Sequence, residues 1–260
     1  MGAAVENLRK DVRMRDEADK MMSNAWILVY LIPFFAGIAI GIAMVYTVFT
    51  TAWIMPEEPI FTASSLAIIF ALSWLLTIIG AIVNIILTYR LVKRRNTHFK
   101  RQTFLFEDIV AAVKTIAAKK DIDVETSLLS CERTGREAKA EETEKGAVLW
   151  AILSAIIFIA QWYVYYFLMK DLYKHERRED GFWEDLTRTL DKLGITFSPP
   201  RRVETTPDRS FVLYLILTII TLGLFGIYWL YVLLKDPNEH FKYHMQFEDQ
   251  LLSTLESVTV

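Results

Sequence analysis

The chain alternates between long apolar stretches and strongly charged segments. Four stretches contain no Asp, Glu, Lys, Arg or His, namely residues 26–51, 64–89, 146–169 and 210–234. Each is long enough to cross a bilayer, because an α-helix needs about 20 apolar residues to span the hydrocarbon core. The pattern therefore predicts an all-α, polytopic integral membrane protein with four apolar helices in the lipid bilayer.

Three of these stretches are followed by one repeated pattern. The stretch closes with Tyr-x-x-x-Lys, a His follows, and an aromatic-Glu-Asp sequence then begins an amphipathic run. The repeated positions are Tyr89, Lys93 and His98; Tyr166, Lys170 and His175; and Tyr231, Lys235 and His240. The runs place apolar residues at helical spacing and carboxylates in the first turn, where they complement the helix dipole. This repetition predicts three units, each a span that continues into an amphipathic helix.

These elements divide the chain into five parts. An N-terminal cytoplasmic amphipathic segment precedes a transmembrane hairpin, which leads into a cytoplasmic helix and a charged loop. The third and fourth spans follow, each with its amphipathic helix. The parts are residues 1–25, 26–93, 94–145, 146–200 and 201–260.

Basic residues determine the expected orientation. Five Lys and Arg precede the first stretch and Arg-Leu-Val-Lys-Arg-Arg follows the second, whereas the loop between the two stretches has none. The positive-inside rule therefore places the N-terminus in the cytoplasm of a multi-pass cell-membrane protein. Four simple spans also return the C-terminus to the cytoplasm.

The same rule conflicts with four simple spans at residues 170–209, which would lie outside although they carry nine Lys and Arg. Re-entrant hairpins would resolve the conflict, with the third stretch bent near Gln161 and the fourth at residues 221–226. Their legs of about 10–12 residues would reach only roughly 15–18 Å and could not cross. We take four spans as the simpler interpretation and leave the side of residues 170–209 open.

The fourth stretch carries a resemblance. Residues 217–241, LTIITLGLFGIYWLYVLLKDPNEHF, resemble the T-L-G-x-x-G-I-Y-W signature of an uncharacterised family of small prokaryotic membrane proteins, a domain of unknown function. The resemblance covers about the last fifth of the chain. It implies a membrane location and a prokaryotic source, and it implies no activity.

Composition and charge exclude several classes of protein. Hydrophobic residues make up 53% of the 260, and the formal net charge of −2 argues against a nucleic-acid partner, which needs a cationic excess. The single cysteine, Cys131, excludes an intramolecular disulfide. No Asp, Glu, Lys, Arg or His lies inside an apolar stretch, which argues against an ion-coupled transporter. The chain contains no catalytic motif that we can identify, so we expect no enzyme.

The repeated histidines His98, His175 and His240 are candidate metal ligands. Three imidazoles brought to one membrane face would suit zinc, copper or haem iron. Against this, His98 and Glu107 would lie on opposite faces of one continuous helix. We therefore favour a packing role for the histidines, predict no cofactor, and keep a metal- or haem-binding protein as an alternative.

The function that we expect is a homo-oligomeric structural or organising component. Its contact surface would be formed by the aromatic-Glu-Asp helices. The contact residues would be Phe106, Trp183 and Phe247, with Glu107, Glu184 and Glu248.

Small and amide residues inside the apolar stretches would serve helix packing. Gly37 and Gly41 give the first span a small-residue face, and Asn84 and Gln161 would bridge neighbouring helices. A passive channel is the second alternative. It would be lined by Ser73, Thr77, Asn84 or Thr221.

Overall fold

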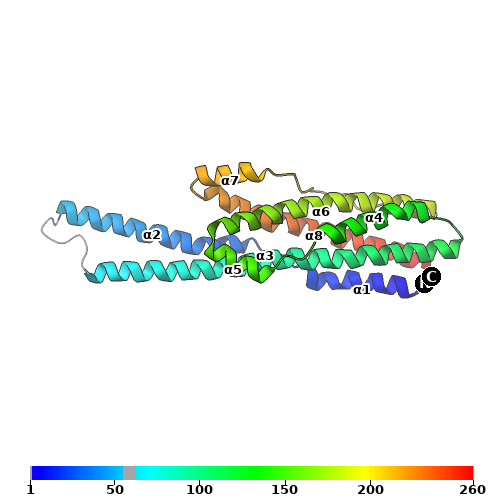
Figure 1. Ribbon diagram of the computed structural model, residues 1–260, viewed down its shortest axis with the longest axis horizontal. Helices are drawn as coiled ribbons and strands as arrows, with labels where there is room; N and C mark the ends of the chain where they lie inside the picture. Colours follow the sequence, from blue (N-terminus) through cyan, green and yellow to red (C-terminus); the bar gives the residue numbers. More distant parts are fainter. Residues whose placement is uncertain (1, 55–62, 260) are drawn as a thin grey trace.

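The computed structural model describes residues 2–54 and 63–259, and within these ranges it contains helices and no strand (Figure 1). The helices are α1 (Gly2–Ala18), α2 (Ala25–Ile54), α3 (Ala63–Lys120), α4 (Glu125–Glu141), α5 (Ala147–Ile156), α6 (Phe158–Lys192), α7 (Phe211–Ile220) and α8 (Leu224–Thr259). The predicted all-α fold class is confirmed.

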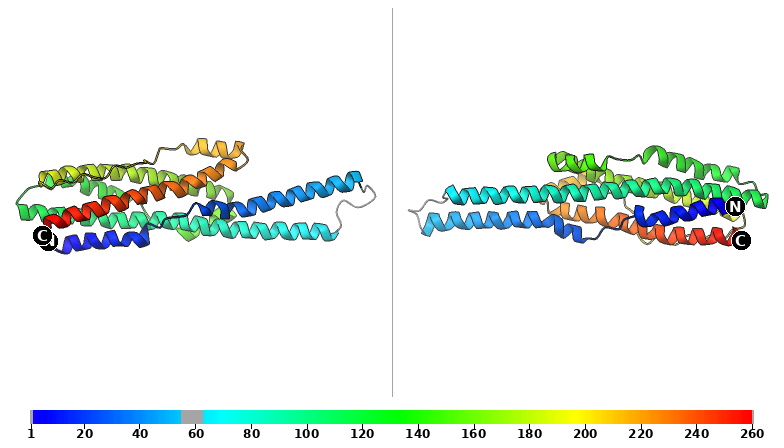
Figure 2. Two further views of the ribbon diagram at one scale, coloured as in Figure 1. Left: turned by 180° about the vertical axis from the view of Figure 1, so that it is seen from behind. Right: turned by 90° about the horizontal axis from the view of Figure 1, so that it is seen from below.

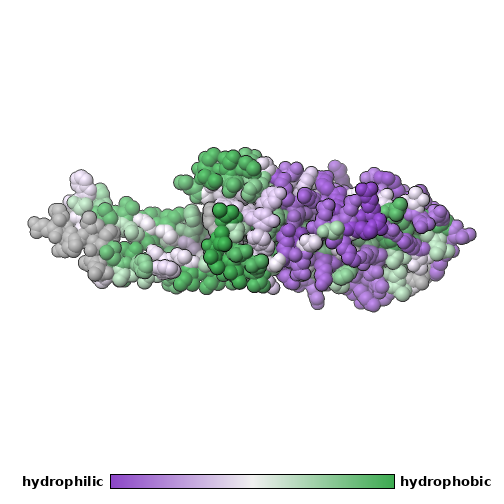
Figure 3. All heavy atoms as spheres, in the orientation of Figure 1, coloured by the Kyte–Doolittle hydropathy of each residue, from purple (hydrophilic) through white to green (hydrophobic). Residues whose placement is uncertain are grey.

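The molecule is elongated and has an apolar end and a polar end (Figure 3). The apolar end consists of α2, residues 63–89 of α3, α5, α7 and the starts of α6 and α8. In this end α2 and α3 are long and apolar enough to cross a membrane. Their large side chains point outward, with Leu28 68% and Ile68 60% exposed. An apolar surface of this extent is typical of contact with a membrane or a partner.

The third and fourth apolar stretches correct the expectation of four uninterrupted helices. Helix α5 ends at Ile156, Ile157 is extended (φ −116°, ψ 106°), and α6 begins at Phe158. Helix α7 ends at Ile220, and the chain turns back into α8 through positive φ angles at Leu222 and Gly223. Glycine adopts such a φ without strain.

Each broken stretch forms a short hairpin beside the part of the longer α2–α3 hairpin that adjoins the polar end (Figure 1). The outward legs α5 and α7 have ten residues each. At 1.5 Å per residue, such a leg is about 15 Å long, roughly half of a hydrocarbon core. The two broken stretches have the hairpin shape of the alternative interpretation, but the third stretch bends at Ile157 and not at Gln161.

The hairpins return the chain to the polar end, where both termini also lie (Figure 2). The basic segment 170–209 belongs to this end as well. Lys170 pairs with Asp208, and Arg209 pairs with Asp236 on α8. The charge conflict created by four simple spans therefore does not arise in this arrangement.

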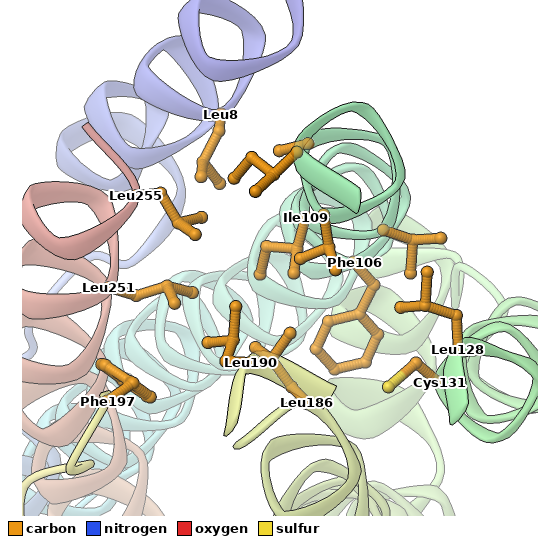
Figure 4. Packing of buried hydrophobic residues seen from close by; sticks show 14 of the residues in the cluster. Leu8, Phe106, Ile109, Leu128, Cys131, Leu186, Leu190, Phe197, Leu251 and Leu255 are labelled. Carbon is orange, nitrogen blue, oxygen red and sulfur yellow. The ribbon is translucent and has the colours of Figure 1, made fainter. Parts of the chain in front are cut away.

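A core of apolar side chains holds the polar end together (Figure 4). Leu8 of α1, Leu128 of α4 and Leu255 of α8 pack around the central helices α3 and α6. The aromatic rings lie in the same core. Phe106 stacks on Phe182 at 3.9 Å, and the Trp183 and Phe247 ring centres are 4.1 Å apart.

These contacts correct the predicted oligomer surface. Phe106, Trp183 and Phe247 are 2%, 4% and 0% exposed, so they join helices of one chain and are not displayed to another copy. Glu107 and Glu184 face solvent and form surface ion pairs with Lys139 and Arg188.

The small and amide residues of the apolar end behave differently from one another. A Cβ atom at Gly37 or Gly41 would meet nothing within 4 Å among the described residues, so these glycines do not support helix packing within the chain. Asn84 donates to the carbonyl oxygen of Ser154 at 3.2 Å and bridges α3 to α5. Gln161 of α6 lies 3.5 Å from the hydroxyl of Thr88 on α3.

Candidate metal centre

The three repeated histidines meet where the apolar end joins the polar end. His98 lies on α3, His175 on α6 and His240 on α8, and all three are at most 2% exposed. The Nε2 atom of His98 is 3.2 Å from that of His175 and 3.1 Å from that of His240. Three imidazoles from three helices therefore turn the same ring nitrogen toward one point.

A carboxylate lies behind each ring. Nδ1 of His98 is 2.9 Å from Asp19, Nδ1 of His175 is 3.0 Å from Glu142, and Nδ1 of His240 is 3.3 Å from Glu176. A carboxylate that accepts a hydrogen bond from Nδ1–H leaves the lone pair on Nε2, although at His240 a guanidinium nitrogen of Arg202 also lies 3.2 Å from Nδ1. The same arrangement orients metal-binding histidines in proteins.

The carboxylates are themselves held in place. Arg101 donates to Asp19 at 2.6 Å and Arg178 donates to Glu142. Glu176 accepts hydrogen bonds from the backbone and side chain of Thr206, at 2.7 and 2.9 Å. These partners come from α3, α6 and the segment before α7, so the rings are fixed by contacts far apart in the sequence.

A second polar layer lies one helical turn further along each long helix. It consists of Gln102, Glu179 and His244, each four positions after a repeated histidine. Glu179 accepts from Gln102 at 2.7 Å, and its other oxygen is 3.7 Å from Nε2 of His240. His244 lies between two carboxylates, 2.6 Å from Glu179 and 2.8 Å from Glu248.

Burial and neighbouring charges set the protonation of the two layers. Burial lowers the pKa of His98 to about 4, although Asp19 opposes the shift, and burial also lowers the pKa of His240. Burial disfavours charge on His244 too, but Glu179 and Glu248 outweigh it and raise the pKa of His244 to about 9. Burial would raise the pKa of Glu179, but His244 lowers it to about 2.

The buried charges around the histidines are nearly balanced. Five carboxylates and three guanidinium groups surround them, the raised pKa of His244 makes its imidazole a further cation, and Arg15 lies 3.8 Å from Glu248. The carboxylates are Asp19, Glu142, Glu176, Glu179 and Glu248, and the guanidinium groups are those of Arg101, Arg178 and Arg202. Buried charges are costly unless they are paired, and each of these carboxylates has a cationic partner.

The spacing fits a small metal ion. Tetrahedral zinc with Zn–N bonds of about 2.0–2.1 Å separates two nitrogen ligands by about 3.3–3.4 Å. The observed Nε2 separations of 3.1 and 3.2 Å are close to this value. The residues whose ligand atoms lie close enough together to hold one ion are His98, His175, His240 and His244, and a carboxylate oxygen of Glu179 lies 3.7 Å from Nε2 of His240. Haem does not fit, because its macrocycle would have to lie between axial ligands and the nitrogens leave no space for it.

A polar pocket of about 80 Å³ adjoins this centre. Glu176 and His240 form part of its lining, together with residues 204–207 and Asp236. A metal site needs such an access route because ions and water must reach ligands that are otherwise buried.

Sequence reasoning found part of the centre. The repeat indicated the three histidines, and the structure places them together. Glu107 lies on the outer face of α3, as the helical geometry required, and other acids surround the rings. Glu179 was missed although it lies one helical turn after His175. Glu248 was predicted at an oligomer contact, but it pairs with His244 and Arg101 inside the chain.

Comparison with known proteins adds one match. The sequence model of a domain of unknown function (DUF4234) matches residues 209–255, the last fifth of the chain. This part includes α7 and most of α8, with His240, His244 and Glu248. No curated protein and no solved structure matches the chain.

Proposed function

We propose that this protein is a membrane-anchored metal protein that binds one divalent transition-metal ion through His98, His175 and His240, with Glu179 as fourth ligand. The observation that carries the proposal is the convergence of three Nε2 atoms with a carboxylate behind each ring. This function takes the place of the homo-oligomeric organiser that we expected from the sequence. Imidazole with one carboxylate suits zinc first, and copper, iron or nickel next.

A purely structural role for the histidines is the competing explanation. Nδ1 of His240 is also 3.2 Å from a guanidinium nitrogen of Arg202, which can only donate, and in that tautomer Nε2 of His240 donates to His98 at 3.1 Å without a metal. The metal proposal requires instead that Nδ1 of each ring is protonated toward its carboxylate and that all three Nε2 lone pairs face the ion. The metal would then join α3, α6 and α8.

The ligand set is closed, and this favours a structural or sensory role for the metal over a catalytic one. Structural zinc sites have four protein ligands, whereas catalytic sites keep one position open for water or substrate. All four proposed ligands are at most 2% exposed. Binding would then contribute directly to the stability of the polar end, because ligands that are assembled only in the folded chain couple binding to folding.

The proposed location follows from the two kinds of hairpin. Helices α2 and α3 cross the membrane, and the α5–α6 and α7–α8 hairpins enter it from one side and return. The polar end, with both termini and the basic segment 170–209, then lies in the cytoplasm by the positive-inside rule. A single Cys at position 198, in a chain with Cys131→Ser, should resist an impermeant thiol reagent in intact cells. Labelling without lysis would contradict this topology.

The metal is tested on the purified full-length chain in detergent. After treatment with a chelator and titration with Zn²⁺, the protein should bind one equivalent, and Co²⁺ should give the visible absorption of a tetrahedral ion. His175→Ala should abolish stoichiometric binding. Glu184→Gln on the exposed face of the same helix is the matched control and should bind normally.

Two results would refute the proposal. One is an intact protein that takes up no equivalent of Zn²⁺, Cu²⁺, Ni²⁺ or Co²⁺. The other is His175→Ala with unchanged stoichiometry and affinity. Homo-oligomerisation and a passive channel stay predictions, and the molecular mass of the same purified sample tests the first of them.

A further inference from the structure

A second site lies in the apolar end. A cavity of about 670 Å³ separates the α2–α3 hairpin from the tips of the two short hairpins. Phe34 of α2, Ala155 of α5 and Ile219 of α7 form part of its walls, and Gly223 and Gly226 line it at the second hairpin. Pockets of about 300–1,000 Å³ are typical of sites for small molecules.

The surroundings of the cavity determine what can reach it. The helices around it expose apolar side chains, with Ile220 70% and Leu222 89% exposed. In the proposed membrane location, a ligand would therefore enter from the bilayer and be lipid-soluble. This inference rests on that location and does not depend on the metal.

Polar groups gather in one part of the wall. Asn84 and Gln161 line the cavity, and each lies 3.5 Å from the hydroxyl of Thr88 through its side-chain oxygen. The amide of Gln161 carries two N–H groups. The described residues give them one partner at most, the hydroxyl of Tyr165. One donor remains for a ligand that offers an acceptor oxygen.

Aromatic rings lie beside these amides. Tyr30, Phe34, Trp162 and Tyr165 all line the cavity. Aromatic walls favour a flat ring, because offset-stacked and edge-to-face ring pairs add to the energy of apolar burial. A saturated acyl chain would use neither the rings nor the amide donor.

We infer that this cavity binds a membrane-dissolved carbonyl-bearing ring compound of the quinone class. A ring carbonyl oxygen accepts a hydrogen bond from Gln161, the ring lies against Trp162 and Tyr165, and the apolar tail follows Phe34 and Ile219 toward the bilayer. Asn84 is held by Ser154 and shapes the polar part of the wall. The inference concerns binding alone.

The test compares two probes on the full-length protein in detergent. Decylubiquinone and a decyl-substituted benzene without carbonyl groups are titrated while intrinsic tryptophan fluorescence and melting temperature are recorded. One hydrogen bond is worth about 1 kcal/mol, so the quinone should bind about five- to tenfold more tightly than the hydrocarbon. Gln161→Leu should remove this preference and keep hydrocarbon binding.

A second variant, with a matched control, tests the cavity independently of whether Gln161→Leu folds. Ala155→Trp should fill the cavity and weaken both probes at least tenfold. Val45→Trp, at a position 70% exposed on α2, is the matched control and should change neither affinity. Equal affinity of the wild type for both probes, binding of neither, or a preference that survives Gln161→Leu would each overturn the inference. His175→Ala should leave quinone binding unchanged, so failure of the metal site and failure of this cavity are separable.

Discussion

The two halves of α3 place their side chains in opposite ways. Toward the apolar end, Ile68 and Phe70 are 60% and 66% exposed. Toward the polar end, Arg101 and His98 are each 1% exposed. One unbroken helix therefore turns apolar groups outward in its first half and charged groups inward in its second. Burial along this helix therefore depends on what packs against each half. The buried charged groups of the second half are stable only with their ionic and hydrogen-bonding partners.

The largest expected effect tests that dependence directly. Arg101→Met leaves Asp19 and Glu248 without their shared cation, and removing one partner of a buried pair costs about 3–5 kcal/mol. The free energy of unfolding of the polar end, followed by circular dichroism in denaturant, should fall by this amount. Arg188→Met, which removes an exposed pair with Glu184, should cost far less, because solvent screens a surface pair. Similar losses of unfolding free energy in both variants would contradict the special dependence of the buried charges on their partners.

An identical substitution in both halves of α3 sharpens the comparison. Ile109 is 0% exposed in the core of the polar end, so Ile109→Ala should cost about 2–5 kcal/mol. Ile68→Ala, in the outward-facing half, should stay within about 0.5 kcal/mol in detergent. Chemical denaturation of the two variants measures both values, and equal costs would contradict the separation into two ends.

A smaller effect, on metal affinity, is expected from changing a carboxylate that orients one of the metal ligands. Glu142→Gln removes the carboxylate that orients His175, and loss of such a partner typically weakens metal affinity 10–100-fold. Competition with a chromophoric chelator measures the change. Glu141→Gln is the neighbouring control, because that side chain is 62% exposed and touches only Arg178 of the network. Unchanged affinity in Glu142→Gln would contradict the role given to the carboxylates.

The smallest effect depends on pH. Burial and the nearby Asp108 raise the pKa of Asp11 on α1 to about 7, from an ordinary value of 3.8. The ionised Asp11 carboxylate therefore destabilises the folded state, and this cost is complete above about pH 7. It disappears below about pH 4, where Asp11 is protonated in both the folded and the unfolded chain. Asp11→Asn should stabilise the protein by on the order of 1–2 kcal/mol at pH 8 and by almost nothing at pH 4. Thermal melts at the two pH values check this, and a gain independent of pH would contradict it.

Local pattern predicted the helices and the position of the three histidines, because both depend on periodic spacing. The turn at Gly223 also has a local cause in a residue that tolerates positive φ. No glycine or proline next to Ile157 predicts the break there. It depends on how α5 packs against α3 and α6, which no single stretch of sequence contains.

The rest of the site was out of reach for the same reason. Asp19 follows the end of α1 and Glu142 follows the end of α4, and both reach the histidines only through the tertiary fold. The aromatic-Glu-Asp positions were predicted as oligomer contacts, but a buried intramolecular contact and an oligomer contact use the same residue types. Only the packing of Phe106 and Phe247 inside one chain distinguishes them.

The joining of the chain's two ends has a consequence for biosynthesis. Arg15 and Asp249 are paired although 234 positions separate them, and the histidine layer takes its last members from α8. The ribosome must therefore have released α8 before this layer can close. Until then, Asp19 and Arg101 lack Glu248 as a partner. Emergence of α8 is thus the step that commits the polar end to its folded form.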